Sequence, residues 1–434
     1  MVNKLLKNYF YYLYLFLFSI GLLIWVYFKG QVFWFDTSMY MGGFMLVQPL
    51  YTILIYLHKF TIGDPVQNYL IVTQTIFLLF SVIFFIERVG NLFNFNIVSK
   101  FLLYHVSILP TVIPGYYFAN KIIPECLAYS LLLLLVSFLL TALKYNSIKN
   151  YYYSLLTLFL ITLTRGQFLS CVPAIALVIF IKYKLKLMNS KTSIVFLLVI
   201  SMPMISNYAE KIIYGVAMGK FESRLITSMN LSGILMFLSE ENDYKLMPDE
   251  ETQLLFKDSY KSLKQKRRLA SQLPKNYSLE KKYTVYDSIV PRITNETIHL
   301  IATDNYIKNH KDYNAALVYA NELIGRMIKP LFFARPFIYL KFIFINAAAT
   351  YGGYLQLFIL TFLTLYFLFK LWNSSKFYFA AIAILLLLVM GNVSVIALAG
   401  HATRRYFFYY DIVLILAAVI VLSKIKLLEK FFIK

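Results

Sequence analysis

The sequence predicts an all-α, polytopic membrane protein with about ten transmembrane helices. Of its 434 residues, 60% are hydrophobic, 18% are aromatic and only 15% are charged. Soluble domains of this size carry about 25% charged residues. The mean hydropathy of the chain is +0.66, and the apolar residues gather in runs of about 20, the length that crosses a bilayer. These observations exclude a water-soluble globular enzyme.

Apolar runs that are long enough to cross the membrane, or nearly so, recur along the chain. They lie near residues 9–28, 68–86, 101–119, 126–143, 151–163, 167–182, 192–207, 353–370, 377–399 and 407–423. The first run follows Lys4 and Lys7 and has no small-residue cleavage site, so we expect a helix that stays in the protein rather than a signal peptide. The fifth run is short and ends at Arg165, which predicts that runs five and six form a broken pair.

Basic residues are unevenly distributed among the segments that join these runs. With the N-terminus in the cytoplasm, the short cytoplasmic segments hold 16 lysines and arginines, and the short external segments hold 6. Because positive charge is retained on the cytoplasmic side, we expect both termini there. The net charge of +21 is then explained by topology and by contact with anionic membrane lipids. Nucleic acid is not an expected partner.

The predicted helices divide the chain into three parts. Residues 1–207 form an N-terminal transmembrane module, 208–350 an extracytoplasmic loop or small helical domain, and 351–434 the C-terminal transmembrane helices. The first external loop, 30–67, contains an amphipathic stretch near 39–59 that we expect to lie in the membrane interface. Heavy use of Tyr, Phe, Ile, Lys and Asn is typical of an AT-rich genome, so we expect a bacterial protein of the cytoplasmic membrane.

Acidic residues at membrane level are costly and therefore indicate function. Asp36 follows three aromatic residues and opens the first external loop. A carboxylate there suits a general base for an acceptor hydroxyl, and the alternative is a helix N-cap. Glu125 follows Pro124 at the start of the fourth run, where the helix dipole alone favours it; it is also a candidate for contact with a metal ion, the donor or the acceptor. We interpret Asp64 as a turn residue and Asp411 as a partner of a neighbouring arginine.

Arginines on the same predicted face form the positive side of the site. Arg165 lies between two apolar half-segments, and Arg404 and Arg405 directly precede the last helix. Guanidinium groups clamp phosphate through paired hydrogen bonds, although snorkelling to the interface explains such arginines as well. Lys59 and Tyr406 are further candidates for this phosphate-binding pocket. The five histidines lack metal-ligand spacing and no nucleotide-binding motif is present, so no cofactor is assigned and a divalent cation stays an alternative.

In these residues the sequence resembles the GT-C superfamily of integral membrane glycosyltransferases, in particular the branch with protein O-mannosyltransferases and lipid A aminoarabinose transferases. The matching pieces, in chain order, are Asp36 with Tyr40, the Pro-containing stretch 48–54, Glu125, the turn 164–167 and Arg405-Tyr406. The resemblance implies that Asp36 is the catalytic base, that the donor is a polyprenyl-phosphate sugar and that the anomeric carbon inverts. We expect three departures from the family, which are fewer helices, a single Asp in the first loop and no soluble C-terminal domain.

Three functions stand as alternatives. The first is a glycosyltransferase that acts at the extracytoplasmic face on a hydroxyl of a lipid-linked glycan, a polysaccharide or a protein, with Tyr40 and Glu125 near the acceptor or a metal ion. The second is a polysaccharide polymerase or ligase that uses a diphosphate-linked glycan. The third is a transporter or flippase for a lipid-linked sugar. A transporter is expected to carry charged or broken-helix features near the bilayer midplane, whereas here they cluster at one face, so the sequence favours the first.

Overall fold

The computed structural model describes most of the chain. It covers residues 2–34, 36–42, 47–63, 66–113, 117–185, 192–222, 227–374, 376–399 and 404–424, without the side chains of 2–8, 227, 309, 404 and 405. Within these residues the regular secondary structure is helical, and the extended contact is a β-bridge between Val32 and Lys121. The predicted all-α class is confirmed for this part of the chain.

The chain divides into two compact units, which we call the first and the second unit. The first unit comprises Met1–Glu210, Leu360–Asn392 and Phe407–Lys434, and the second comprises Lys211–Ile359 and Val393–Tyr406. The N-terminal and C-terminal membrane segments therefore belong to one unit, and the long middle segment forms another.

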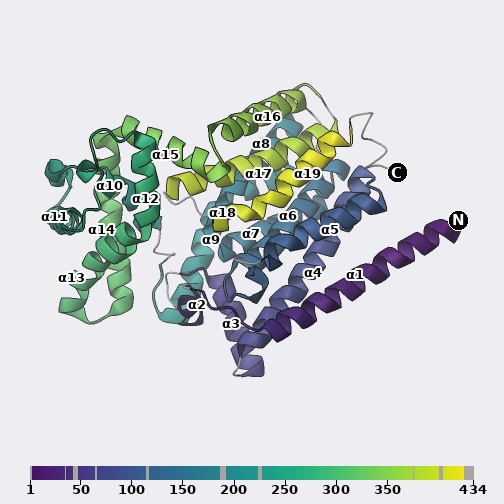
Figure 1. The fold of residues 1–434 in the computed structure, drawn as a ribbon, viewed down its shortest axis with the longest axis horizontal. Helices are drawn as coiled ribbons and strands as arrows, with labels where there is room; N and C mark the ends of the chain where they lie inside the picture. Colours follow the sequence, from purple (N-terminus) through teal and green to yellow (C-terminus); the bar gives the residue numbers. More distant parts are fainter. Residues whose placement is uncertain are drawn as a thin grey trace. The chain divides into compact units, whose positions relative to one another are not determined.

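Long apolar helices make up the first unit, and α6 is its most buried helix. α6 lies between α4 and α7 (Figure 1), and 89% of its most apolar stretch is buried inside the protein. The elements are α1 Val2–Lys29, α2 Thr37–Gly42, α3 Pro49–Ile62, α4 Val66–Phe93, α5 Ile97–Val112, η1 Phe118–Asn120, α6 Glu125–Tyr145, α7 Ile148–Thr164, η2 Gly166–Ser170, α8 Cys171–Lys184, α9 Thr192–Met218, α16 Tyr354–Trp372, α17 Phe377–Ala399, α18 Arg404–Phe407, η6 Phe408–Tyr410 and α19 Asp411–Leu422. Helices α9, α16, α17 and α18 continue across a boundary between the units.

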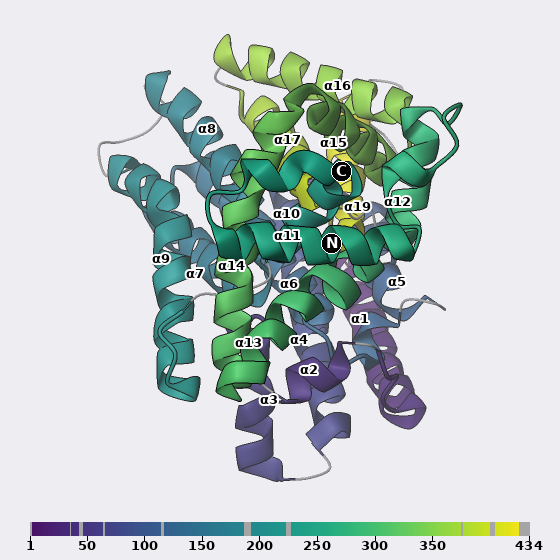
Figure 2. The same ribbon diagram turned by 90° about the vertical axis from the view of Figure 1, so that its left-hand side faces the viewer.

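The second unit is a bundle of shorter helices around its own hydrophobic core. α14 packs against both α10 and α13, as Figure 2 shows. The core contains large fully buried side chains such as Phe256, Tyr286 and Phe342. Its elements are α10 Thr227–Phe237, η3 Glu241–Leu246, α11 Glu250–Gln265, η4 Ala270–Gln272, α12 Leu279–Ile293, the π-helix η5 Thr294–His299, α13 Leu300–His310, α14 Tyr313–Ala334 and α15 Pro336–Tyr351.

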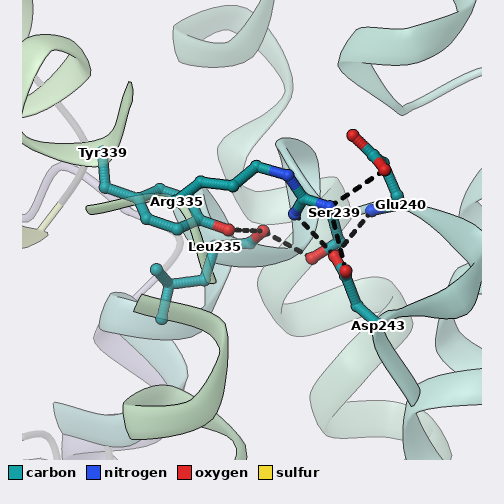
Figure 3. Close-up of polar contacts among 6 residues, drawn as sticks. All are labelled: Leu235, Ser239, Glu240, Asp243, Arg335 and Tyr339. Carbon is teal, nitrogen blue, oxygen red and sulfur yellow. Dashed lines mark hydrogen bonds and ion pairs between the residues drawn. The ribbon is translucent and has the colours of Figure 1, made fainter. Parts of the chain in front are cut away.

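Arg335 separates α14 from α15 and fixes the break between them. Pro336 disfavours helical backbone in the residue before it, and Arg335 has φ −147° and ψ 58°. Its guanidinium makes hydrogen bonds of 2.7 and 2.9 Å to the two carboxylate oxygens of Asp243 and lies 3.1 Å from Glu240 (Figure 3). These contacts join the break to the start of η3.

Seven helices of the described residues are long and apolar enough to cross a membrane, and they coincide with seven of the predicted runs. The chain is therefore a polytopic membrane protein. The remaining three runs are helical but shorter. Run 101–119 contains the 16-residue α5, run 151–163 the 17-residue α7, and run 407–423 is divided among α18, η6 and α19. The total of ten transmembrane helices stays a prediction.

Two predicted features of the chain path have clear counterparts in the structure. The amphipathic stretch near 39–59 contains parts of α2 and α3, with residues 43–46 outside the described part. The helix predicted to break at Arg165 does so, since α7 ends at Thr164 and Arg165 has an extended backbone, φ −154° and ψ 117°.

The segment 313–351 covers the last part of the predicted extracytoplasmic loop or small helical domain, and it contains the apolar helices α14 and α15. α14 and α15 together pass the same test of length and apolar composition, although they are bent by 103° at Arg335. If this pair is one crossing, the number of candidate spans rises to eight. Lys329, Arg335 and Lys341 interrupt the apolar residues of this segment, which is why its sequence does not stand out as a membrane span.

Candidate active site at one end of the first unit

A buried ion pair joins two of the predicted site residues. Arg165 Nη1 lies 2.6 Å from Glu125 Oε1. The Glu125 side chain is fully buried and that of Arg165 is 10% exposed. Since α6 begins at Glu125 and the antiparallel α7 ends at Thr164, the two residues meet at one end of the helix pair. The negative charge of Glu125 is therefore balanced by Arg165.

The segment before α19 supplies a third partner to this pair. The Tyr409 hydroxyl lies 3.2 Å from Arg165 Nη1, with Arg165 as donor. The helix break after Arg165 is also held by α17, because Gln167 Nε2 donates to Asn392 Oδ1 at 3.2 Å. A Cβ atom on Gly391 would stand 2.7 Å from the backbone oxygen of Ser170. Only glycine permits this close approach of α17 to η2.

The first external loop is attached to the segment that leads into α6. Val32 forms the β-bridge with Lys121, and its backbone N–H donates to the Asn120 oxygen at 2.8 Å. The Asn120 amide in turn donates to the oxygens of Val26 and Gly30 at 3.0 and 2.9 Å. Lys121 Nζ lies 3.7 Å from the centre of the Trp34 ring. Asp36, two residues beyond Trp34, is thereby held near the loop that leads to Glu125.

Asp36 is half-buried in a turn that begins α2. The backbone N–H of Trp34 donates to the Thr37 hydroxyl at 3.2 Å. The backbone N–H of Tyr40 donates to the backbone oxygen of Asp36 at 3.1 Å. The Tyr40 hydroxyl donates to Gln48 Oε1 at 3.1 Å. Tyr40 is buried, and its hydroxyl joins α2 to Gln48, the residue before α3.

A chain of buried polar side chains continues from Tyr40 toward α6. The rings of Tyr40 and Tyr51 meet edge to face at 5.5 Å, and the Tyr51 hydroxyl donates to Gln74 Oε1 at 3.0 Å. The Gln74 amide then donates to the backbone oxygens of Ala119 and Lys121 at 2.8 and 2.9 Å. Burial raises the pKa of Tyr51 well above its ordinary value, so this hydroxyl is a neutral donor rather than a base.

The sequence did not identify several members of this site: Tyr51, Gln74, Lys121 and Tyr409. One signal was present for Gln74, because an amide in the middle of an apolar run needs a hydrogen-bond partner in the membrane. For Tyr409, one aromatic residue in a run of five gives no such signal.

Among the other predicted residues, Lys59 and Tyr406 have described side chains, whereas Arg404, Arg405 and Asp64 do not. Lys59 Nζ donates to the Met41 oxygen at 3.1 Å, beside α2. Tyr406 is half-buried and belongs to the second unit. The side chains of Arg404 and Arg405 are not among those described, and neither is Asp64. A role of these residues in phosphate binding stays a prediction.

The described residues contain no group of three or more His, Cys, Asp or Glu side chains that could hold a metal ion. The divalent cation therefore stays an untested alternative. Of the two carboxylates predicted for the site, Glu125 is fully buried and ion-paired, while Asp36 keeps partial access to solvent. In comparisons with protein-family models, curated proteins and solved structures, the chain matches none of them.

Proposed function

We propose that this protein is a membrane glycosyltransferase in which Asp36 is the general base. It would move a sugar from a polyprenyl-phosphate donor to an acceptor hydroxyl at the extracytoplasmic face of the cytoplasmic membrane. The observation that carries the proposal is the difference in exposure between the two predicted carboxylates. Glu125 is fully buried against Arg165, whereas Asp36 is half-buried in the turn that begins α2. A base must come within hydrogen-bond reach of the proton it removes, which favours Asp36.

The reaction needs one proton acceptor and one stabilised leaving group. Asp36 accepts the proton of the acceptor hydroxyl as its oxygen attacks the anomeric carbon of the sugar. The bond between that carbon and the phosphate oxygen breaks, and the electron pair leaves with the polyprenyl phosphate. Attack opposite the leaving group inverts the anomeric carbon. Cationic groups aimed at the departing phosphate lower the barrier, and Lys59, Arg404 and Arg405 are our candidates.

The buried group of Glu125, Arg165 and Tyr409 has a positioning role in this scheme. It joins the start of α6 to the helix break after α7 and to the segment before α19. The loop that carries Asp36 is attached to the same end of α6 through Val32 and Lys121. A rigid support of this kind keeps a base within the narrow range of geometry that catalysis requires.

The test compares Asp36→Asn with Glu87→Gln in the native host. Glu87 is also a partly buried carboxylate of the first unit, with a side chain that is 24% exposed, and it lies in α4, where it pairs with Lys100 away from the proposed site. Lipid-linked sugars and surface glycans are quantified by mass spectrometry, and membrane abundance by immunoblot. We expect Asp36→Asn to accumulate a monophosphate-linked sugar and to lose one glycan residue at normal abundance, whereas Glu87→Gln leaves both unchanged.

Other outcomes separate the remaining functions. An unchanged glycan in Asp36→Asn, with the protein present, rejects Asp36 as the base. Accumulation of diphosphate-linked oligosaccharides after deletion of the gene favours the polymerase or ligase. Accumulation of a lipid-linked sugar in the cytoplasmic leaflet alone favours the transporter.

A further inference from the structure

A cavity with basic and aromatic walls lies at the opposite end of the first unit. Its volume is about 310 Å³, and its walls include Asn94, Lys376, Phe377, Tyr378 and Lys424. These residues come from the end of α4, the start of α17 and the segment after α19. The candidate active site is at the other end of α6, which has 21 residues and is therefore about 30 Å long.

The charges around this cavity are all positive in the part of the chain that the structure describes. No acidic residue is among its described walls. Neither Lys376 Nζ nor Lys424 Nζ has a hydrogen-bond or ion-pair partner among the described residues. A third ammonium group, that of Lys144, donates to the oxygen of the wall residue Leu92 and lies 5.7 Å from the Phe377 ring. Like charges gathered in this way favour the binding of an anion.

Aromatic rings give the cavity an apolar side as well. The rings of Phe93 and Phe377 stack with their centres 5.3 Å apart, and both residues line the cavity. Asn94 turns the chain here with φ +58°, so α4 ends at the cavity. A ligand with a phosphate and an adjoining apolar part can contact both the lysines and the aromatic rings of the cavity.

We propose that this cavity binds the phosphate of an anionic lipid. Lys376 and Lys424 pair with the phosphate oxygens, while Phe93 and Phe377 pack against the glycerol and the first acyl carbons. Lys376 directly precedes α17, which is long and apolar enough to cross the membrane, and Lys424 follows the shorter apolar helix α19. We expect the ends of these helices to lie at the level of the lipid headgroups. This site is separate from the proposed transferase centre and does not depend on it. Both a membrane lipid and free phosphate carry the group that the lysines would bind. We assign the lipid because the aromatic rings of the cavity offer a contact to its apolar part.

The test uses the full-length protein in detergent micelles and a pyrene-labelled phosphatidylglycerol as the probe. Lys376→Gln/Lys424→Gln removes both charges from the cavity. The matched control is Lys184→Gln/Lys370→Gln, which removes two lysines from the last turns of α8 and α16. Their ammonium groups lie over the rings of Trp372 and Tyr366 instead of in the cavity. Binding of labelled phosphatidylcholine and competition by inorganic phosphate are measured in parallel. Unfolding midpoints verify that all variants fold.

We expect the cavity variant to bind phosphatidylglycerol about thirtyfold more weakly, the sum expected for two lysines at an anionic surface. The control variant should bind as the wild type does, and phosphatidylcholine should bind weakly to all three. An equal loss in the control variant would mean that surface charge alone attracts the lipid, and the cavity is then not a site. If millimolar inorganic phosphate displaces the labelled lipid completely, the ligand is free phosphate and the lipid assignment is wrong.

Discussion

Glu125 and Arg165 form a buried ion pair although they are 40 residues apart in the chain. The pair lies where α6 begins and α7 ends, and Tyr409 adds a hydrogen bond to Arg165 from a third element. Removing two charges from water costs several kcal/mol per ion, which their attraction and hydrogen bonds offset. Loss of either Glu125 or Arg165 should therefore alter the geometry at this end of the first unit.

Loss of one partner alone should destabilise the protein strongly. In Glu125→Gln the Arg165 guanidinium loses its counter-charge, and in Arg165→Gln the Glu125 carboxylate does. We expect each single substitution to cost about 3–5 kcal/mol. The double substitution should cost less than either, because no buried charge is left. The measurement is the thermal unfolding midpoint in detergent by fluorescence-detected size exclusion, and additive losses in the double variant would contradict the coupling.

The sequence allowed prediction of both residues but not of their pairing. A glutamate after a proline and an arginine between two apolar half-segments are visible as local patterns. Each has a local explanation, the helix dipole for Glu125 and snorkelling for Arg165. Which side chain meets which depends on how α6 and α7 are placed, and no local pattern encodes that contact.

The prediction of the helices was limited in a similar way. Runs of high hydropathy predicted α4, α6 and α17 well, because their apolar residues are nearly uninterrupted. α9 extends to Met218 although Glu210 and Lys211 interrupt its apolar residues. Hydropathy identifies burial or lipid contact, whereas the end of a helix depends on caps and on tertiary contacts.

The close approach of α17 to η2 predicts that a methyl group added at Gly391 destabilises the protein. A Cβ atom at Gly391 would be 2.7 Å from the Ser170 oxygen, so Gly391→Ala forces α17 or η2 to move. We expect a loss of about 1–3 kcal/mol. Gly21→Ala is the matched control, because a Cβ atom on that helical glycine has nothing within 4 Å. Equal midpoints for the two variants would show that α17 and η2 are not in contact in solution.

His299 predicts a pH dependence of the second unit. The imidazole is buried at the end of η5, its Nε2 has no hydrogen-bond partner among the described residues, and burial lowers its pKa below the ordinary value of 6.5. The unfolded chain therefore binds more protons than the folded one as the pH falls below about 6.5. Above about pH 6.5 the neutral imidazole makes its full contribution to stability. This contribution decreases as the pH falls toward the pKa of His299 in the folded protein.

We expect the unfolding midpoint of the wild type to decrease from about pH 7.5 to about pH 5.5, within the range where histidine titrates. His299→Gln cannot take up the proton and should show a smaller decrease. Scanning fluorimetry of both proteins in matched buffers measures this difference. Parallel pH profiles would show that other groups cause the decrease.

The two hydrogen bonds from Arg335 to Asp243 predict that lysine cannot replace arginine at this position. Its guanidinium binds both oxygens of Asp243, a geometry that lysine cannot reproduce. Arg335→Lys should therefore speed amide exchange in η3 and at the start of α15, with a loss of about 1–3 kcal/mol. Arg326→Lys is the control, because Arg326 is 42% exposed and pairs with Asp249 at 3.3 Å, and exposed pairs contribute about 1 kcal/mol or less. Equal exchange in both variants would mean that the break does not depend on Arg335.

The exposed face of α15 predicts contact with lipid rather than with water. Phe337 is 83% exposed, and Leu340 and Phe344 are more than half exposed on the same helix. Only the turn at Gly352 and Gly353 separates α15 from α16, which is long and apolar enough to cross the membrane. Large apolar side chains this exposed are rare on water-facing surfaces unless they form a contact site. We therefore expect α15 to lie within the membrane or its interface.

Brominated lipids test the position of α15 directly, because bromine quenches only the tryptophans that touch the acyl region. A tryptophan introduced as Phe337→Trp should add fluorescence that brominated lipid quenches, measured as the difference from the wild type with its three tryptophans. Leu254→Trp is the matched control, since Leu254 is 56% exposed on the polar helix α11 and should stay unquenched. If both new tryptophans escape quenching, α15 faces water or another protein. If both are quenched, the second unit enters the membrane well beyond α15, and the external placement predicted for its polar helices is wrong.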